Sequence, residues 1–268
     1  MSAVRDLTYP PVVLAAKTAF KVLGMTIDIR GAEHIPRSGG AVLALNHISY
    51  VDFILGGFAA QPSKRLVRFM AKRELFTHRA AGPLMRSLHH IEVDRGEGLA
   101  SYAEALRYLR EGEVVGIFPE ATISRAMELK EFKSGAPRLA AATEVPLVPA
   151  VLWGTQRMMT KDHPRDFSRG HHITIAVGQP LHPTGAHPVA ETAELKASMA
   201  ALLDETIRGY PDTPDGQWWA PASYGGTAPT LAEAAQLDAA EKRERAKKFV
   251  AKEREKRAKA AARQARKR

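Results

Sequence analysis

The sequence contains no cysteine, and this absence removes several kinds of site at once. Disulfide bonds, thiolate zinc sites, iron–sulfur ligation and cysteine nucleophiles all need a thiol. A long hydrophobic run is also missing, because Lys17 and Lys21 interrupt the only long apolar stretch near the N-terminus, whereas a spanning helix needs roughly 18 to 20 apolar residues. The first residues lack the pattern of a secretory signal. We therefore expect an intracellular protein without a transmembrane helix.

Net charge is lacking over most of the chain as well. The 268 residues carry a formal net charge of +10. Residues 241–268 hold fourteen Lys or Arg and four Glu, so residues 1–240 are neutral overall. The excess charge therefore indicates an acidic partner for the C-terminal tail and gives no information about the chemistry of the body.

The body has the composition and the pattern of an α/β domain. Hydrophobic residues make up 45% of the chain and charged residues 25%, which is enough to build a core. Short apolar runs typical of buried strands alternate with segments of helical period. These runs cover residues 41–47, 67–70, 114–118, 145–152 and 173–177, and residues 91–96 are also strand-like. The alternation predicts one α/β domain over residues 26–210.

Three further segments surround this domain. Residues 1–25 predict an amphipathic helix with Val12, Ala16 and Phe20 on one face; it either packs on its own domain or lies on a membrane surface. Residues 211–230 form a Pro/Gly-rich linker, which Trp218 and Trp219 anchor to the body or to a membrane. Residues 231–268 are strongly helix-forming but have few apolar side chains, so this basic tail is expected to project, bind an acidic partner or fray.

The first motif with chemical potential places His47 at the end of a strand and Asp52 five residues later. A helical turn brings Asp52 back toward one imidazole nitrogen, where it fixes the tautomer and leaves the other nitrogen to accept a proton from a hydroxyl. The bland alternative is a histidine that caps a helix or packs in the core. This motif alone therefore only suggests a catalytic dyad.

The second motif is Phe-Pro-Glu-Ala-Thr-Ile-Ser-Arg at residues 118–125, followed by Lys130 and Lys133. Strand ends in open α/β sheets form ligand crevices, and hydroxyl groups with cations suit a phosphate. A capped helix start explains the same residues. Between the two motifs, Arg95 follows a strand and either grips a phosphate or pairs with Asp94. The adjacent histidine pairs at 89–90 and 171–172 are not spaced to bind one metal ion together, because neighbouring residues on a strand face opposite ways. We predict no metal and no cofactor.

Taken in order, the motifs resemble those of the glycerolipid acyltransferase family, which the 1-acylglycerol-3-phosphate acyltransferases typify. The matching blocks are NH-x4-D at residues 46–52, the DR pair at 94–95, FPE-x-T-x-S at 118–124, FKSGA at 132–136 and VPLVPA at 145–150. The resemblance covers about residues 26–180. It implies a mixed, mostly parallel sheet flanked by helices, and transfer of a fatty acyl group from an acyl thioester to a lysophospholipid hydroxyl.

The resemblance also implies roles for individual residues. His47 would be the general base and Asp52 would orient it. Arg95 and Lys72 would hold or assist the acceptor phosphate, while Glu120 and Thr122 would shape the glycerol site. The substrate-binding residues expected from the motifs are Lys72, Arg95, Glu120, Thr122, Ser124, Arg125 and Lys133.

The chain departs from the family pattern inside the second motif. Most members have Glu-Gly-Thr-Arg-Ser, whereas this chain has Ala121 and Ile123 in place of the glycine and the arginine. Arg125 lies two positions later and is a candidate replacement for the lost cation. The form resembles the actinobacterial branch of the family. The acceptor is then either 1-acylglycerol-3-phosphate, which gives phosphatidic acid, or a glycolipid or other alcohol.

The expected partners follow from this reading. They are a lysophospholipid acceptor, an acyl thioester donor that is either acyl-coenzyme A or acyl carrier protein, and an anionic membrane surface. The expected location is peripheral, on the cytoplasmic face of the cell membrane. A rival of a different class is a nucleic-acid or ribosome-binding protein acting through the basic tail. The tail lacks the interleaved aromatic residues of a base-stacking site, so no specific nucleic acid is expected.

Overall fold

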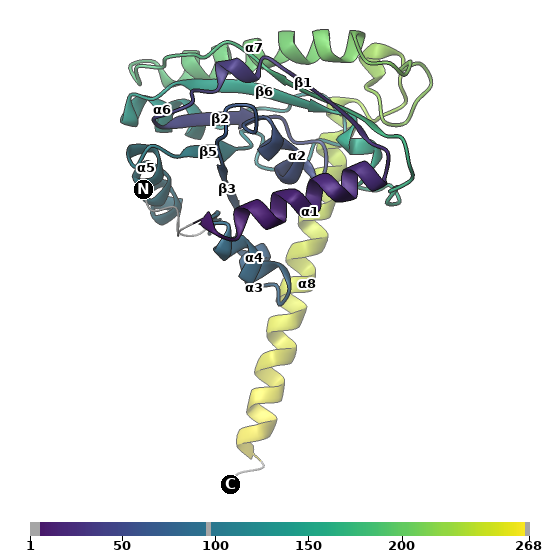
Figure 1. Cartoon of the computed structure of the whole chain (residues 1–268). Coiled ribbons are helices and arrows are strands. Elements are labelled where there is room, and N and C mark those ends of the chain that lie inside the picture. Colours follow the sequence, from purple (N-terminus) through teal and green to yellow (C-terminus); the bar gives the residue numbers. More distant parts are fainter. Residues whose placement is uncertain (1–5, 95–97, 266–268) are drawn as a thin grey trace.

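A seven-stranded sheet organises the chain in the computed structural model, which describes residues 6–94 and 98–265 (Figure 1). The strand order is β1-β7-β6-β2-β5-β3-β4. Neighbouring strands run parallel except β6 and β7, which are antiparallel. The strands are β1 (Thr26–Arg30), β2 (Ala41–Leu45), β3 (Val67–Lys72), β4 (Ile91–Val93), β5 (Val114–Ile117), β6 (Leu147–Trp153) and β7 (His172–Val177). The predicted mixed, mostly parallel α/β sheet is confirmed.

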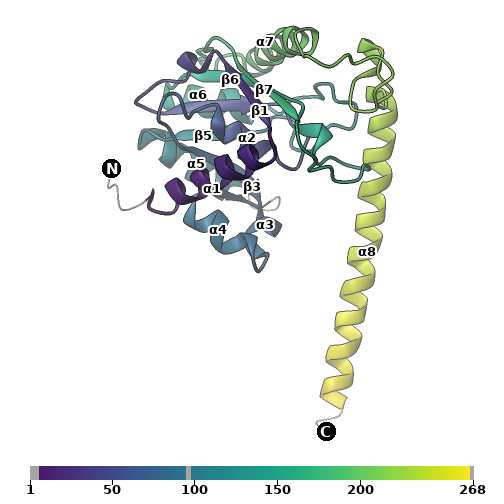
Figure 2. The same ribbon diagram turned by 45° about the vertical axis from the view of Figure 1, so that its right-hand side comes forward.

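Helices cover both faces of this sheet (Figure 2). The α-helices are α1 (Tyr9–Val22), α2 (Asp52–Phe58), α3 (Arg73–Thr77), α4 (Ala81–Ser87), α5 (Gly98–Arg110), α6 (Gly135–Thr143), α7 (Pro188–Arg208) and α8 (Leu231–Ala265). Strand β2 is buried on both faces: Val42 and Ala44 pack into a core shared with α5, α6 and α7, whereas Leu43 and Leu45 pack into a second core with α1 and α2. Burial on both faces explains why β2 has no polar residue.

Three helices begin where proline and glycine suggest a loop. Helices α4 and α6 have Pro83 and Pro137 as their third residues, and α7 starts at Pro188 rather than near residue 195 as its apolar period predicts. The first turn of a helix has no intrahelical partner for its N–H groups, so proline is tolerated there. The sequence pattern alone therefore does not reveal α4 and α6, and its apolar period begins later than α7 does.

The N-terminal helix α1 packs one face on the domain. Its Phe20 lies 5.5 Å from the ring of Phe58 in α2. Leu14 and Val22 face outward, with 66% and 62% of their surface exposed. Among the described residues, no helix is both long enough and apolar enough to cross a bilayer.

The aromatic pair in the 211–230 segment docks on the body. Trp219 is only 4% exposed and packs against Trp153 and Tyr210 at ring distances of 6.2 and 5.7 Å, while Trp218 stacks on His163 at 3.9 Å. These contacts agree with the docking interpretation of the pair. Helix α8 follows this segment and extends beyond the rest of the fold (Figure 2).

Candidate active site

The candidate site begins where β2 ends. The side-chain amide of Asn46 donates to the carbonyl of Leu152 at 3.0 Å and accepts from the Leu152 N–H at 2.7 Å. This pair of bonds extends the ladder between β2 and β6 by one side chain. Asn46 is fully buried, so it fixes the direction in which the chain leaves the sheet and thereby the position of His47.

His47 and Asp52 form the hydrogen bond that their spacing predicts. The imidazole Nδ1 lies 2.9 Å from Oδ2 of Asp52, which is fully buried at the first residue of α2. The N–H groups of Ile48 and Ser49 donate to the same oxygen, each at 2.7 Å. An ionised carboxylate only accepts hydrogen bonds, so it holds the imidazole proton on Nδ1.

The other ring nitrogen of His47 is left available for proton transfer. No polar atom among the described residues hydrogen-bonds to Nε2, and the side chain is 21% exposed. Phe118 stacks on the imidazole at 4.3 Å and in turn stacks on Phe69 at 5.7 Å. The arrangement gives the imidazole a fixed tautomer, one apolar wall and access to solvent, which suits a general base.

Thr155 completes the hydrogen bonding of the Asp52 carboxylate. Its hydroxyl donates to Oδ1 at 2.6 Å, and the side chain is fully buried. The sequence pattern does not single out Thr155, because residues 145–152 before it have only the pattern of a strand. A usable signal was present: Thr155 follows the end of β6 as His47 follows the end of β2, and these strands are parallel neighbours.

Glu120 ties the second motif to the first. Its Oε1 accepts from the His47 N–H at 2.8 Å and its Oε2 accepts from the Lys130 N–H at 3.0 Å. The carboxyl is 5% exposed. Burial raises the pKa of Glu120 to about 7, although the two backbone hydrogen bonds oppose this shift. Glu120 thus holds the backbone of His47 in place.

Thr122 and Ser124 belong to the same loop. The ammonium of Lys130 donates to the hydroxyl of Thr122. Ser124 is fully buried, its N–H donates to the carbonyl of His47 at 2.7 Å, and its hydroxyl donates to the carbonyl of Glu128 at 2.7 Å. The loop is therefore bonded to both the N–H and the carbonyl of His47.

The backbone conformation at Ala121 explains why most family members have glycine at this position. Its φ is +61°, in the left-handed region that favours glycine. The glycine that most members have at this position suits the turn better than alanine does.

The four predicted cations are placed differently from one another. Arg125 contacts the carboxylates of Asp162, Asp238 and Glu241. Lys72 lies at the end of β3 with an exposed side chain, Lys133 is also exposed, and Arg95 lies outside the described residues. The structure thus brings His47, Asp52, Glu120, Thr122, Ser124 and Arg125 into one connected region.

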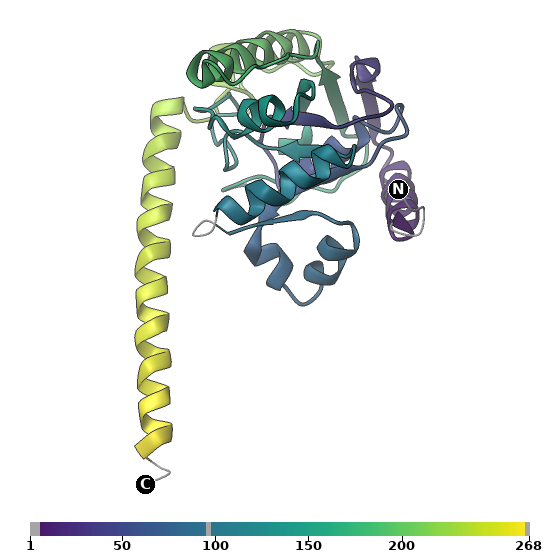
Figure 3. The same ribbon diagram turned by 90° about the vertical axis from the view of Figure 1, so that its left-hand side faces the viewer.

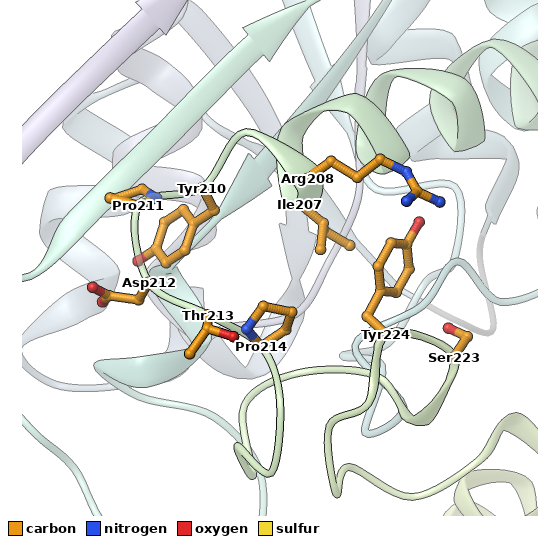
Figure 4. Close-up of a pocket in the computed structure, with 9 residues that line it drawn as sticks. All are labelled: Ile207, Arg208, Tyr210, Pro211, Asp212, Thr213, Pro214, Ser223 and Tyr224. Carbon is orange, nitrogen blue, oxygen red and sulfur yellow. The ribbon is translucent and has the colours of Figure 1, made fainter.

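Two other features of the described residues lie outside this network. No three His, Asp or Glu side chains within residues 6–94 and 98–265 converge as a metal site requires. A hollow of about 500 Å³ lies at the end of α7 (Figure 4). It contains none of the predicted site residues; it is lined by Ile207, Arg208, Tyr210, Pro211, Asp212, Thr213, Pro214, Ser223 and Tyr224.

Comparisons with known proteins agree with these motifs. The model of the family described as Acyltransferase matches residues 26–153. A 1-acyl-sn-glycerol-3-phosphate acyltransferase of Bacillus subtilis (strain 168) is 32% identical over 184 residues, which are 68% of this chain and 86% of that protein. The alpha form of the same enzyme from Mus musculus is 31% identical over 169 residues, which are 62% of this chain and 58% of that protein.

A solved structure is also similar. The crystal structure of the 1-acyl-sn-glycerophosphate (LPA) acyltransferase PlsC from Thermotoga maritima superposes with a TM-score of 0.64 at 25% sequence identity. The match covers 77% of this chain and 83% of that one.

Proposed function

The chain belongs to the acyltransferase family, and on this premise we infer that it is a 1-acylglycerol-3-phosphate O-acyltransferase. It moves a fatty acyl group from an acyl thioester to the free hydroxyl of 1-acylglycerol-3-phosphate and so produces phosphatidic acid for phospholipid synthesis. The observation that supports this function best is the hydrogen bond between His47 Nδ1 and Asp52, which leaves Nε2 as a base beside an apolar wall.

The mechanism is direct transfer. Nε2 of His47 takes the proton of the acceptor hydroxyl while the hydroxyl oxygen attacks the thioester carbonyl. The tetrahedral intermediate collapses, the carbon–sulfur bond breaks, and the imidazolium returns the proton to the leaving thiolate. Asp52 remains ionised and stabilises the imidazolium. A general base of this kind raises the reaction rate about 100- to 10,000-fold. Substrate positioning and oxyanion stabilisation supply the rest of the rate enhancement.

No covalent acyl-enzyme is needed. A thioester is already activated toward attack, and the two serines whose N–H groups bond to Asp52 and His47 donate their hydroxyls elsewhere. The hydroxyl of Ser49 donates to the carbonyl of Met159 at 2.6 Å, and that of Ser124 donates to the carbonyl of Glu128 at 2.7 Å. These contacts support a histidine base acting on the substrate hydroxyl.

The acceptor phosphate is bound by cations around the site. Lys72, Arg95 and Lys133 are the proposed contacts, with Arg125 as a replacement for the arginine that Ile123 displaces. Arg125 already contacts three carboxylates, which compete with the phosphate for its guanidinium. Glu120 and Thr122 shape the glycerol site through the loop that they stabilise.

The donor is acyl-coenzyme A or acyl carrier protein, and the enzyme acts on the cytoplasmic face of the cell membrane as a peripheral protein. The exposed apolar residues of α1 and the basic surface of α8 support this location. The acceptor and the product are amphiphiles, so the active site must meet a lipid surface.

The test is release of free thiol from palmitoyl-coenzyme A with and without 1-acylglycerol-3-phosphate. We expect acceptor-dependent release by the wild type, loss of at least 100-fold in His47→Ala, and no change in His182→Ala, which removes an exposed histidine. Full activity of His47→Ala would contradict the mechanism. Activity only with a glycolipid acceptor would replace the assigned acceptor.

A further inference from the structure

Helix α8 is divided in charge along its length. Residues 231–241 contain Glu233, Asp238 and Glu241 and no Lys or Arg, whereas residues 242–265 contain eleven Lys or Arg and three Glu. The two parts also differ in contact with the body. Among the residues of α8 with described side chains, only Ala234, Asp238 and Glu241 are not exposed. Their spacing of four and three residues places them on one helical face.

The acidic pair meets a cluster of three cations on the body, which we call the α8 joint: Asp238 and Glu241 with Arg125, Lys130 and Lys161. Asp238 contacts Arg125, and it lies 3.2 Å from the Lys130 ammonium and 3.0 Å from that of Lys161. Glu241 lies 3.0 Å from both Arg125 and Lys161. The three cationic side chains are only 8%, 17% and 11% exposed, so water screens these contacts weakly.

The α8 joint is built on the loop that holds the catalytic base. The N–H of Lys130 donates to one oxygen of Glu120, whose other oxygen accepts from the N–H of His47. Ser124, next to Arg125 in the chain, donates its N–H to the carbonyl of His47. A short path of hydrogen bonds therefore connects α8 to the residue that performs the chemistry.

Beyond the α8 joint, the helix leaves the body. Figures 1 and 3 show its C-terminal half extending past α3 and α4, away from the sheet. At about 1.5 Å per residue, residues 242–265 reach about 36 Å. We call this part the basic arm. Phe249 and Val250 are exposed on it, at 67% and 50%, among the surrounding Lys and Arg side chains, a composition that suits the boundary between lipid head groups and acyl chains.

We propose that the α8 joint fixes the basic arm rigidly to the catalytic loop, so that anionic lipid bound by the arm sets the orientation of His47 toward the bilayer. The proposal rests on the acyltransferase function inferred above. The partner is an anionic lipid surface, because the arm is basic and the acceptor is an anionic amphiphile. A loosened joint leaves the arm able to bind but lets the active site sample unproductive orientations, which lowers the effective concentration of membrane-borne acceptor.

The test compares Asp238→Asn, which removes the carboxylate that contacts all three cations, with Glu244→Gln. The control removes one negative charge from the same helix, and Glu244 pairs with Lys247 within α8. Each protein is assayed with a short-chain 1-acylglycerol-3-phosphate dispersed as monomers, and with a long-chain acceptor in phosphatidylglycerol vesicles. Binding to the same vesicles is measured by co-sedimentation.

We expect Asp238→Asn to keep vesicle binding and monomeric turnover within about twofold of the wild type, and to lose at least tenfold in turnover of the vesicle-borne acceptor. Glu244→Gln should match the wild type in all three assays. Unchanged vesicle turnover in Asp238→Asn would overturn the proposal. An equal loss with both acceptors would mean that the joint merely stabilises the loop, and faster monomeric turnover would mean that α8 inhibits the site; either result overturns the proposal.

Two further results separate this proposal from the acyltransferase function itself. Absence of monomeric turnover in the wild type would refute the function, whatever the role of α8. Monomeric turnover without any binding to anionic vesicles would leave the function standing and overturn the proposal. Such a result would favour another acidic partner for the basic arm, such as RNA.

Discussion

The junction between β2 and α2 and the helix α8 hold functional groups in place by different forces. At the junction, the Asp52 carboxylate is fully buried and accepts hydrogen bonds from two backbone N–H groups and from Thr155 as well as contacting His47. On α8, the ion pairs of Asp238 and Glu241 form the link to the body, and apart from Ala234 the other residues of the helix with described side chains are exposed. Hydrogen bonds to buried backbone groups fix the position of a side chain, whereas ion pairs at the base of a projecting helix fix the orientation of that helix.

The largest expected effect comes from breaking the junction at its carboxylate. Asp52→Asn keeps the size of the side chain but removes the charge that holds the proton on Nδ1 of His47. We expect kcat to fall about 100- to 10,000-fold, measured as acceptor-dependent thiol release. Circular dichroism and the thermal midpoint control for folding. A loss below tenfold in a folded variant would mean that Asp52 does not control the tautomer.

The buried Glu120 predicts a pH dependence of stability at the same junction. The pKa of Glu120 is about 7 in the folded protein and near 4.5 in the unfolded protein. Between these two pH values the folded state therefore keeps a proton that the unfolded state has released. The contribution of Glu120 to the free energy of unfolding is therefore complete below pH 4.5 and is lost as pH rises through 7. The loss is on the order of 3 kcal/mol.

Urea unfolding at pH 5 and pH 8 measures this effect. Glu120→Gln carries no titrating proton, so it should lose less stability than the wild type over the same interval. Parallel losses in the two proteins would assign the pH dependence to other groups.

Thr155 provides a finer test of the junction. Thr155→Val removes the hydrogen bond to Asp52 while keeping the shape of the side chain, and we expect kcat to fall about tenfold with KM for both substrates within twofold. Thr155→Ser should restore most of the activity because it restores the hydroxyl. A thermal midpoint that falls in Thr155→Val without any change in kcat would reduce Thr155 to a packing residue.

Salt distinguishes the two regions directly. Raising NaCl from 0.1 to 0.5 M shortens the Debye length from about 10 Å to about 4 Å. The affinity of the basic arm for phosphatidylglycerol vesicles should fall about tenfold. Turnover of a monomeric short-chain acceptor should change by less than about twofold. If both fell together, the arm and the site would respond to the same electrostatic interaction and the contrast between the regions would fail.

The smallest expected effect concerns the backbone of the loop beside His47. Ala121→Gly relieves the left-handed conformation at φ +61° and should stabilise the protein by about 0.5 to 1 kcal/mol in urea unfolding. Ala200→Gly, at an exposed position within α7, should destabilise by a similar amount. A destabilising effect of glycine at both positions would show that the turn does not strain alanine.

Much of the fold was predictable because its central strands β2, β5 and β6 are short apolar runs that are buried on both faces. Helices α4 and α6 were not, because Pro83 and Pro137 read as loop residues and only their place in the first turn makes them compatible with a helix. Within the site, the hydrogen bond between His47 and Asp52 followed from local spacing. Thr155 did not, since it lies 103 residues from its partner along the chain.

The residues that could do chemistry, and the class of fold in which they lie, can be recognised from the sequence alone. Motifs with fixed spacing and apolar runs are properties of short segments. They can be recognised from sequence because the contacts within such a segment depend on residues that are neighbours in the chain. Only the tertiary structure decided that Thr155 supports Asp52, that Glu120 bonds to the backbone of His47, and that Arg125 contacts the start of α8. These contacts join segments far apart in the chain, and their geometry depends on how parallel strands and their loops come together at one edge of the sheet.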